Sequence, residues 1–107
     1  SAIELRNGTR YTRRVIQSFA TKDTERVWAR KFVPRLGPEL TRVAHRKLQA
    51  LDAAQRLADL ASPPGNRLEP LSGDRAEQHS IRVNDQYRLC FTWTPVGPVD
   101  MEIVDYH

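Results

Sequence analysis

The sequence predicts an α+β fold of order β-α-α-β-β-β-β, in which two N-terminal helices pack on one face of an antiparallel sheet. Helical apolar spacing fills the middle of the chain, and short alternating apolar segments with short polar links fill the second half. Consecutive strands with short links pair as an antiparallel meander, and helices can cover one face of such a sheet. The 107 residues are enough for one domain of this kind.

The first half of the chain predicts one strand and two helices. The run VIQSF at 15–19 is rich in β-formers and predicts the first strand. A first helix is expected over 21–32, where acidic residues suit the first turn. The second helix is expected from Pro38 to about Leu60, because apolar residues recur there at i, i+3 and i+4.

The second half predicts four strands. They are expected at 67–71, 79–83, 87–93 and 99–106, and each alternates between apolar and polar residues. The segment SGDR at 72–75 predicts a turn between the first two of them. Strands that follow one another so closely have room only for antiparallel connections.

The link between the second and third of these strands fixes their register. A two-residue turn would pair apolar with polar side chains. A three-residue loop at 84–86 pairs Ile81 with Leu89 and Arg82 with Arg88, which keeps one face apolar. This register therefore predicts two arginines directly across from each other.

Like charges in that position destabilise a sheet, so the arginine pair needs an explanation. One explanation is a polyanionic partner whose phosphates neutralise both guanidinium groups. The other is pairing with carboxylates of the chain itself, from among Glu69, Glu77, Asp100 and Glu102. The sequence alone leaves both open.

Charge and composition exclude several classes of protein. The formal net charge of +4 is unevenly placed, because residues 1–14 are strongly basic while the last third of the chain is acidic. A single cysteine excludes an internal disulfide framework, and the sequence contains no Cys/His cluster of the kind that binds a metal ion. No apolar run is long enough to cross a bilayer, and no secretory signal begins the chain, so the reducing cytoplasm is the expected location.

Four segments in fixed order make the sequence resemble a known family. They are IQSFA, LDAAQRLADLASPPGNRLEPLSGDR, SIRVNDQYRLCF and the terminal MEIVDYH. Together they resemble the HigB toxins, members of the RelE/ParE superfamily from higBA type II toxin–antitoxin modules that are also described as plasmid-maintenance killer proteins. The resemblance covers residues 15–107, the expected toxin domain. Residues 1–14 are interpreted as a basic extension that is disordered or introduced by cloning.

The resemblance implies a RelE-like α+β fold and a metal-independent mRNA endoribonuclease without cofactors. Such a toxin cuts mRNA in the ribosomal A site and so inhibits translation and growth. The implied partners are the ribosome with its mRNA and a HigA-type helix-turn-helix antitoxin, through which alone the complex would contact operator DNA. The implied location is the bacterial cytoplasm, without membrane contact.

The resemblance also implies a set of site residues. The catalytic candidates are His107, Tyr106, Asp105, Arg88 and Arg82. The RNA-binding candidates are Arg67, Arg75 and Ser72. Two positions depart from the family, because some members carry a histidine in place of Glu69 and a lysine in place of Ser72. A histidine exchanges protons near neutral pH and arginines bind phosphate, so the set suits RNA cleavage by the 2′-hydroxyl.

Two other functions remain open at this point. A ParE-like toxin of the same superfamily inhibits DNA gyrase without being a nuclease. A weakly active or non-catalytic regulator would act only by binding the antitoxin, and the residues found at Glu69 and Ser72 keep that alternative open. A terminal histidine is also compatible with a plain, solvated strand end.

Overall fold

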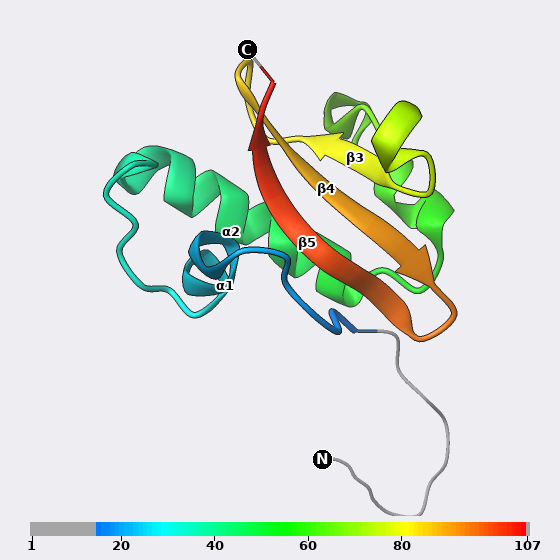
Figure 1. Cartoon of the computed structure of the whole chain (residues 1–107), viewed down its shortest axis with the longest axis horizontal. Helices are drawn as coiled ribbons and strands as arrows, with labels where there is room; N and C mark the ends of the chain where they lie inside the picture. Colours follow the sequence, from blue (N-terminus) through cyan, green and yellow to red (C-terminus); the bar gives the residue numbers. More distant parts are fainter. Residues whose placement is uncertain (1–14, 107) are drawn as a thin grey trace, which may run out of the picture.

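The computed structural model describes residues 15–106, so the expectations for residues 1–14 and His107 lie outside the described part of the chain. Two helices precede a four-stranded sheet, as predicted (Figure 1). The α-helices and strands are α1 (Lys22–Trp28), α2 (Gly37–Ala53), β2 (Glu69–Pro70), β3 (His79–Arg82), β4 (Tyr87–Thr94) and β5 (Gly97–Asp105). Three short 3-10 helices lie at Leu57–Ala61, Pro64–Asn66 and Gly73–Arg75.

The sheet has the strand order β2-β3-β4-β5, and every neighbouring pair is antiparallel. The predicted register is confirmed, because Ile81 pairs with Leu89 and Arg82 pairs with Arg88. Asn84 closes the three-residue loop, since its side-chain Oδ1 accepts the backbone N–H groups of both Gln86 and the first residue of β4. The expected strand at 67–71 is reduced to the two residues of β2.

The predicted first strand is wrong. Residues 15–19 are extended beside β5 but form only one isolated bridge, between Phe19 and Met101, which is parallel. The backbone of Asp100 interrupts the ladder, because its φ is 56° and its N–H donates to the Ser18 hydroxyl instead of to a main-chain carbonyl. Pro98 has no N–H to donate. Its carbonyl oxygen accepts the backbone N–H of Gln17 at 2.9 Å.

Helix α2 ends at Ala53, seven residues before the predicted end. The Asp59 carboxylate accepts the backbone N–H groups of Gln55 and Arg56, at 3.0 and 3.1 Å. Those two groups are therefore satisfied outside a continuous helix, and a separate 3-10 helix begins at Leu57. The first helix is also shorter than predicted, because α1 ends at Trp28.

Helix α2 and the sheet enclose the hydrophobic core. Both helices contact β5, and α1 also packs against α2. Figure 1 shows α2 crossing behind the strands. The fully buried side chains include Val27, Leu48, Leu51, Ile81, Leu89, Phe91 and Met101. In the described part of the chain, neither helix is both long and apolar enough to cross a membrane.

The loop after α2 is held by one buried asparagine. The Asn66 side chain is 1% exposed, and its amide donates to the carbonyl oxygens of Leu60 and Ser62 at 3.1 and 3.2 Å. Its Oδ1 accepts from Lys47 of α2 at 2.5 Å. This network fixes the chain just before Arg67.

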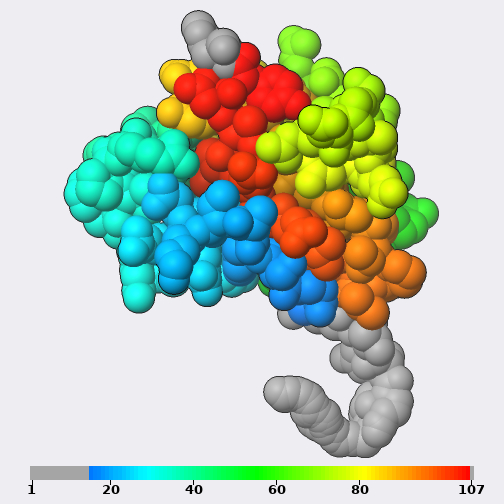
Figure 2. All heavy atoms as spheres, in the orientation of Figure 1, coloured from blue at the N-terminus to red at the C-terminus, as the bar shows by residue number. Residues whose placement is uncertain are grey.

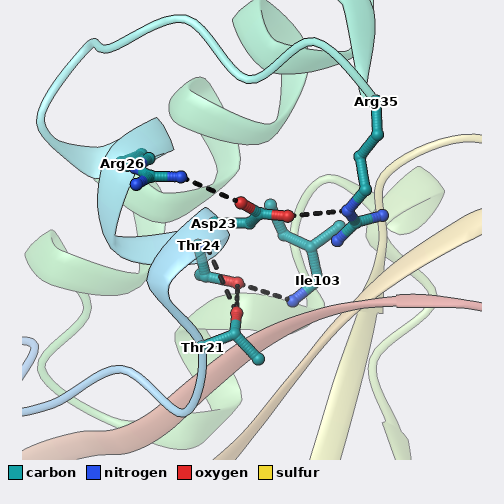
Figure 3. A network of polar contacts seen from close by, with 6 residues as sticks. All are labelled: Thr21, Asp23, Thr24, Arg26, Arg35 and Ile103. Atoms are coloured by element: carbon teal, nitrogen blue, oxygen red, sulfur yellow. Dashed lines mark hydrogen bonds and ion pairs between the residues drawn. The ribbon is translucent and has the colours of Figure 1, made fainter.

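Helix α1 satisfies the outer edge of β5. The Thr24 hydroxyl accepts the backbone N–H of Ile103 at 3.0 Å, and it lies 2.8 Å from the hydroxyl of the N-cap residue Thr21 (Figure 3). In the same view, Asp23 bridges Arg26 and Arg35. An edge strand with free N–H groups is a site for unwanted pairing, so this contact protects the sheet.

We predict that Thr24→Val lowers the free energy of unfolding by about 1–3 kcal/mol, because Thr24 is fully buried and its loss leaves the Ile103 N–H without an acceptor. Denaturant unfolding measures the change. Thr24→Ser is the matched control, since it keeps the hydroxyl. Equal stability of Thr24→Val and wild type would show that this edge contact contributes nothing.

Candidate functional site

The face of the sheet that points away from the core carries most of the candidate site. Side chains alternate along a strand, so Arg88 and Cys90 of β4 lie opposite the core residues Leu89 and Phe91. Ser80 of β3 pairs with Cys90 and lies on the same face as Arg88. The polar face is therefore a direct result of the register between β3 and β4.

Arg88 is held in one orientation by three hydrogen bonds. Its Nε donates to the Ser80 hydroxyl at 2.7 Å, and its Nη2 donates to the carbonyl oxygens of Arg67 and Ser80 at 2.5 and 3.3 Å. The Arg67 backbone has a φ of 47°, a left-handed conformation that is uncommon for residues other than glycine. Because the Arg88 side chain is only 11% exposed, its position is fixed before any ligand arrives.

Two groups lie beside this fixed guanidinium. The Glu69 carboxylate is 3.8 Å from Arg88 Nη2, and its side chain is 55% exposed. The Tyr106 ring lies with its centroid 6.0 Å from Arg88 Cζ, within the range of a cation–π contact. Arg88 thus faces one solvated carboxylate and one aromatic ring.

Arg75 reaches the same face from the turn before β3. It donates to the Glu102 carboxylate of β5 at 3.1 Å and to the Gln78 side chain at 2.8 Å. Figure 2 shows the C-terminal part of β5, in red, side by side with the yellow-green segment that contains this turn. A second arginine is therefore fixed close to the end of the chain.

Cys90 and Tyr106 lie between the two arginines. Burial raises the pKa of the Cys90 thiol, although Arg75 acts in the opposite direction. Burial also raises the pKa of the Tyr106 hydroxyl, and the neighbouring Cys90 raises it further. Both groups therefore keep their protons at neutral pH.

The remaining predicted residues lie around this centre. Arg82 forms an ion pair with Asp85 in the loop after β3. At the end of β5, Asp105 accepts a hydrogen bond from Gln86 at 3.0 Å. The Arg67 side chain is exposed, although its carbonyl binds Arg88. Ser72 is exposed at the start of the turn that carries Arg75.

The two facing arginines each have a carboxylate of their own. Arg88 is next to Glu69, one of the four acids considered from the sequence, whereas Arg82 uses Asp85, which was not among them. The repulsion across the ladder is therefore relieved within the chain. It does not by itself require a polyanion.

Sequence reasoning missed two residues that hold the arginines, Ser80 for Arg88 and Gln78 for Arg75. Glu102 was considered as a partner of the Arg82–Arg88 pair, but it binds Arg75 instead. The alternation along β3 places Ser80 on the face of the arginines and is the one sequence signal for it. In residues 15–106, no group of three or more His, Cys, Asp or Glu side chains is placed to hold a metal ion.

Comparison with known proteins connects this geometry to a family. Residues 17–107 match the family model described as the RelE-like toxin of the type II toxin–antitoxin system HigB. Toxin HigB-1 of Vibrio cholerae is 60% identical over 48 residues, which cover 45% of this chain and 50% of that protein. An uncharacterized protein of Haemophilus influenzae is 41% identical over 59 residues, covering 55% of this chain and 58% of that protein.

The aligned segments thus span about half the length of the curated relatives that the chain matches. The family match is much longer and includes Arg75 in the turn before β3, Arg88 on β4 and the end of β5. The chain belongs to the HigB-like family of RelE-like toxins from type II toxin–antitoxin systems.

Proposed function

We propose that this toxin is a metal-independent endoribonuclease that cuts mRNA in the A site of the ribosome and so stops translation and growth. A HigA-type helix-turn-helix antitoxin would neutralise it in the bacterial cytoplasm, and the complex would reach operator DNA only through that antitoxin. Membership in the HigB-like family supports the toxin role. The sheet face around Arg88 supports the chemistry.

One observation carries the proposal, namely the fixed guanidinium of Arg88 beside Tyr106 and close to Arg75. A group that is oriented before the reaction stabilises developing negative charge without a cost of reorganisation. Arg88 has that property, because three hydrogen bonds hold it and only 11% of its side chain is exposed. An arginine pair of this kind suits the phosphate of a scissile RNA bond.

The reaction needs no metal ion. The 2′-oxygen of the RNA attacks the adjacent phosphorus while the bond from phosphorus to the 5′-oxygen breaks, giving a 2′,3′-cyclic phosphate and a 5′-hydroxyl. One group takes the proton of the 2′-hydroxyl, and another gives a proton to the leaving oxygen. We assign these two roles to His107 and Tyr106, and burial, which raises the pKa of Tyr106, keeps its hydroxyl protonated at neutral pH.

Supporting roles follow from position. Asp105 precedes Tyr106 at the end of β5 and would orient His107, and Arg82 would bind the RNA backbone next to the cut. The exposed side chains of Arg67 and Ser72 are available to bind neighbouring phosphates. These assignments rest on placement in the sequence and on exposure.

The charge balance of the site supports dependence on the ribosome. Arg88 is paired with Glu69 and Arg75 with Glu102, so the two arginines add no net charge to attract free RNA. The ribosome can replace that attraction by holding the codon in position, because fixing the reacting groups in the right geometry lowers the entropic part of the activation barrier. We therefore expect little cleavage of free RNA.

The first test is mRNA cleavage by the purified protein with and without ribosomes, read by primer extension. Wild type should cut only ribosome-bound mRNA, while Arg88→Ala and His107→Ala should lose about 100-fold or more in rate. Arg56→Ala is the control, because its side chain is 79% exposed just before the 3-10 helix at Leu57–Ala61 and belongs to no proposed site. Both variants should still bind antitoxin.

Three results would contradict this proposal. Full cleavage by both variants would remove the site assignment. A DNA-damage response with intact mRNA in expressing cells would identify a gyrase inhibitor of the ParE type instead, and antitoxin binding without growth inhibition would identify a regulator.

A second prediction concerns Glu69, which a scissile phosphate must displace from Arg88. Glu69→Gln removes the competing charge. The affinity of the toxin for ribosome-bound mRNA that carries a 2′-deoxy nucleotide at the cut site should therefore rise by up to about fivefold, which corresponds to the free energy of a half-exposed ion pair. Glu77→Gln has the same change in charge at another exposed position and should have no effect. Weaker binding of Glu69→Gln would mean that Glu69 supports the site.

A further inference from the structure

A groove of about 340 Å³ lies between the C-terminal end of α1 and the N-terminal half of α2. Its apolar lining comes from Val27, Phe32 and Pro38, with Thr41 and His45 of α2 beside them. Phe32 is 70% exposed and is among the large hydrophobic side chains that reach solvent in the described part of the chain. An exposed aromatic ring at the side of a hollow is a common anchor for a binding partner.

The charged lining of the groove is entirely cationic. It consists of Arg30, Lys31 and Arg42. Arg42 is neutralised by Glu39 of the same helix, at 2.6 Å. Within residues 15–106, no carboxylate lies in ion-pair range of Arg30 or Lys31. Among residues 15–106, the groove therefore offers two positive charges without an ion-pair partner beside an apolar surface.

The groove is formed without a ligand. Trp28 stacks on His45 with ring centroids 5.7 Å apart, which joins the end of α1 to α2. The backbone N–H groups of Arg30 and Lys31 return to carbonyl oxygens of α1 at 3.1 and 2.8 Å. Burial and the nearby Arg30 lower the pKa of His45, so its imidazole is neutral at pH 7 and adds no charge to the lining.

We infer that this groove binds an acidic peptide segment that inserts one apolar side chain beside Phe32 and places carboxylates near Arg30 and Lys31. Under the proposed function, on which the identity of the partner rests, this segment belongs to the antitoxin. The apolar lining suits an inserted aliphatic or aromatic side chain, and the positive charges beside it suit carboxylates of the same segment.

The groove is separate from the candidate site. Figure 1 shows the α1–α2 connection on one side of the molecule and β3 with the turn before it on the other. No residue of the groove belongs to the proposed catalytic set. An antitoxin held here can bind a toxin whose catalytic residues are mutated.

The test measures the affinity of the full-length toxin for the protein encoded beside its gene, at low and high salt. Phe32→Ser should weaken binding by about tenfold or more, as expected for an anchor side chain. The double variant Arg30→Gln/Lys31→Gln should weaken binding at low salt and reduce its salt dependence. Val96→Ser and Lys22→Gln are the matched controls, since both residues are exposed and outside the groove.

Unchanged affinity in the groove variants, with unchanged melting temperatures, would overturn the inference. Loss of ribosome binding with intact antitoxin binding would also overturn it and would identify RNA as the occupant. The proposed function fails separately, if wild type leaves ribosome-bound mRNA intact. If such an inactive toxin still bound the antitoxin through the groove, the inference about the groove would stand and the proposed nuclease function would be rejected.

Discussion

Arg82 lies directly opposite Arg88 in the β3–β4 ladder, and this register determines both faces of the sheet. A shift by one residue would exchange the faces of a strand. Leu89 and Phe91 would then leave the core, and Arg88 would enter it. The three-residue loop that Asn84 closes therefore sets the register on which both the core and the orientation of the Arg88 guanidinium depend.

The parts of the fold that follow from local periodicity were predictable. Alternation of apolar residues predicted the antiparallel order and the register, because a strand with one buried face tolerates no other pairing. Helical spacing predicted both helices. The alternation along β4 also placed Arg88 on the polar face. The core side chains Ile81 and Leu89 were predicted to pair, and they do.

The parts that depend on particular side-chain bonds were not predictable. Asp59 ends the helical run by accepting backbone N–H groups, although the apolar spacing continues past it. The left-handed backbone of Asp100 breaks the pairing of residues 15–19 with β5, and its N–H donates to the Ser18 hydroxyl. The contact of Arg75 with Glu102 joins residues 27 apart in the chain, and no local pattern encodes such a distance.

The left-handed backbone at Arg67 joins the loop after α2 to the polar face. Its carbonyl binds Arg88, and the residue before it, Asn66, is bonded to Lys47 of α2. Local opening of this loop therefore removes one of the bonds that orient the guanidinium. The opening equilibrium of this loop and the fraction of molecules with Arg88 in its bound orientation are therefore linked, so the stability of a surface loop is part of the stability of the site.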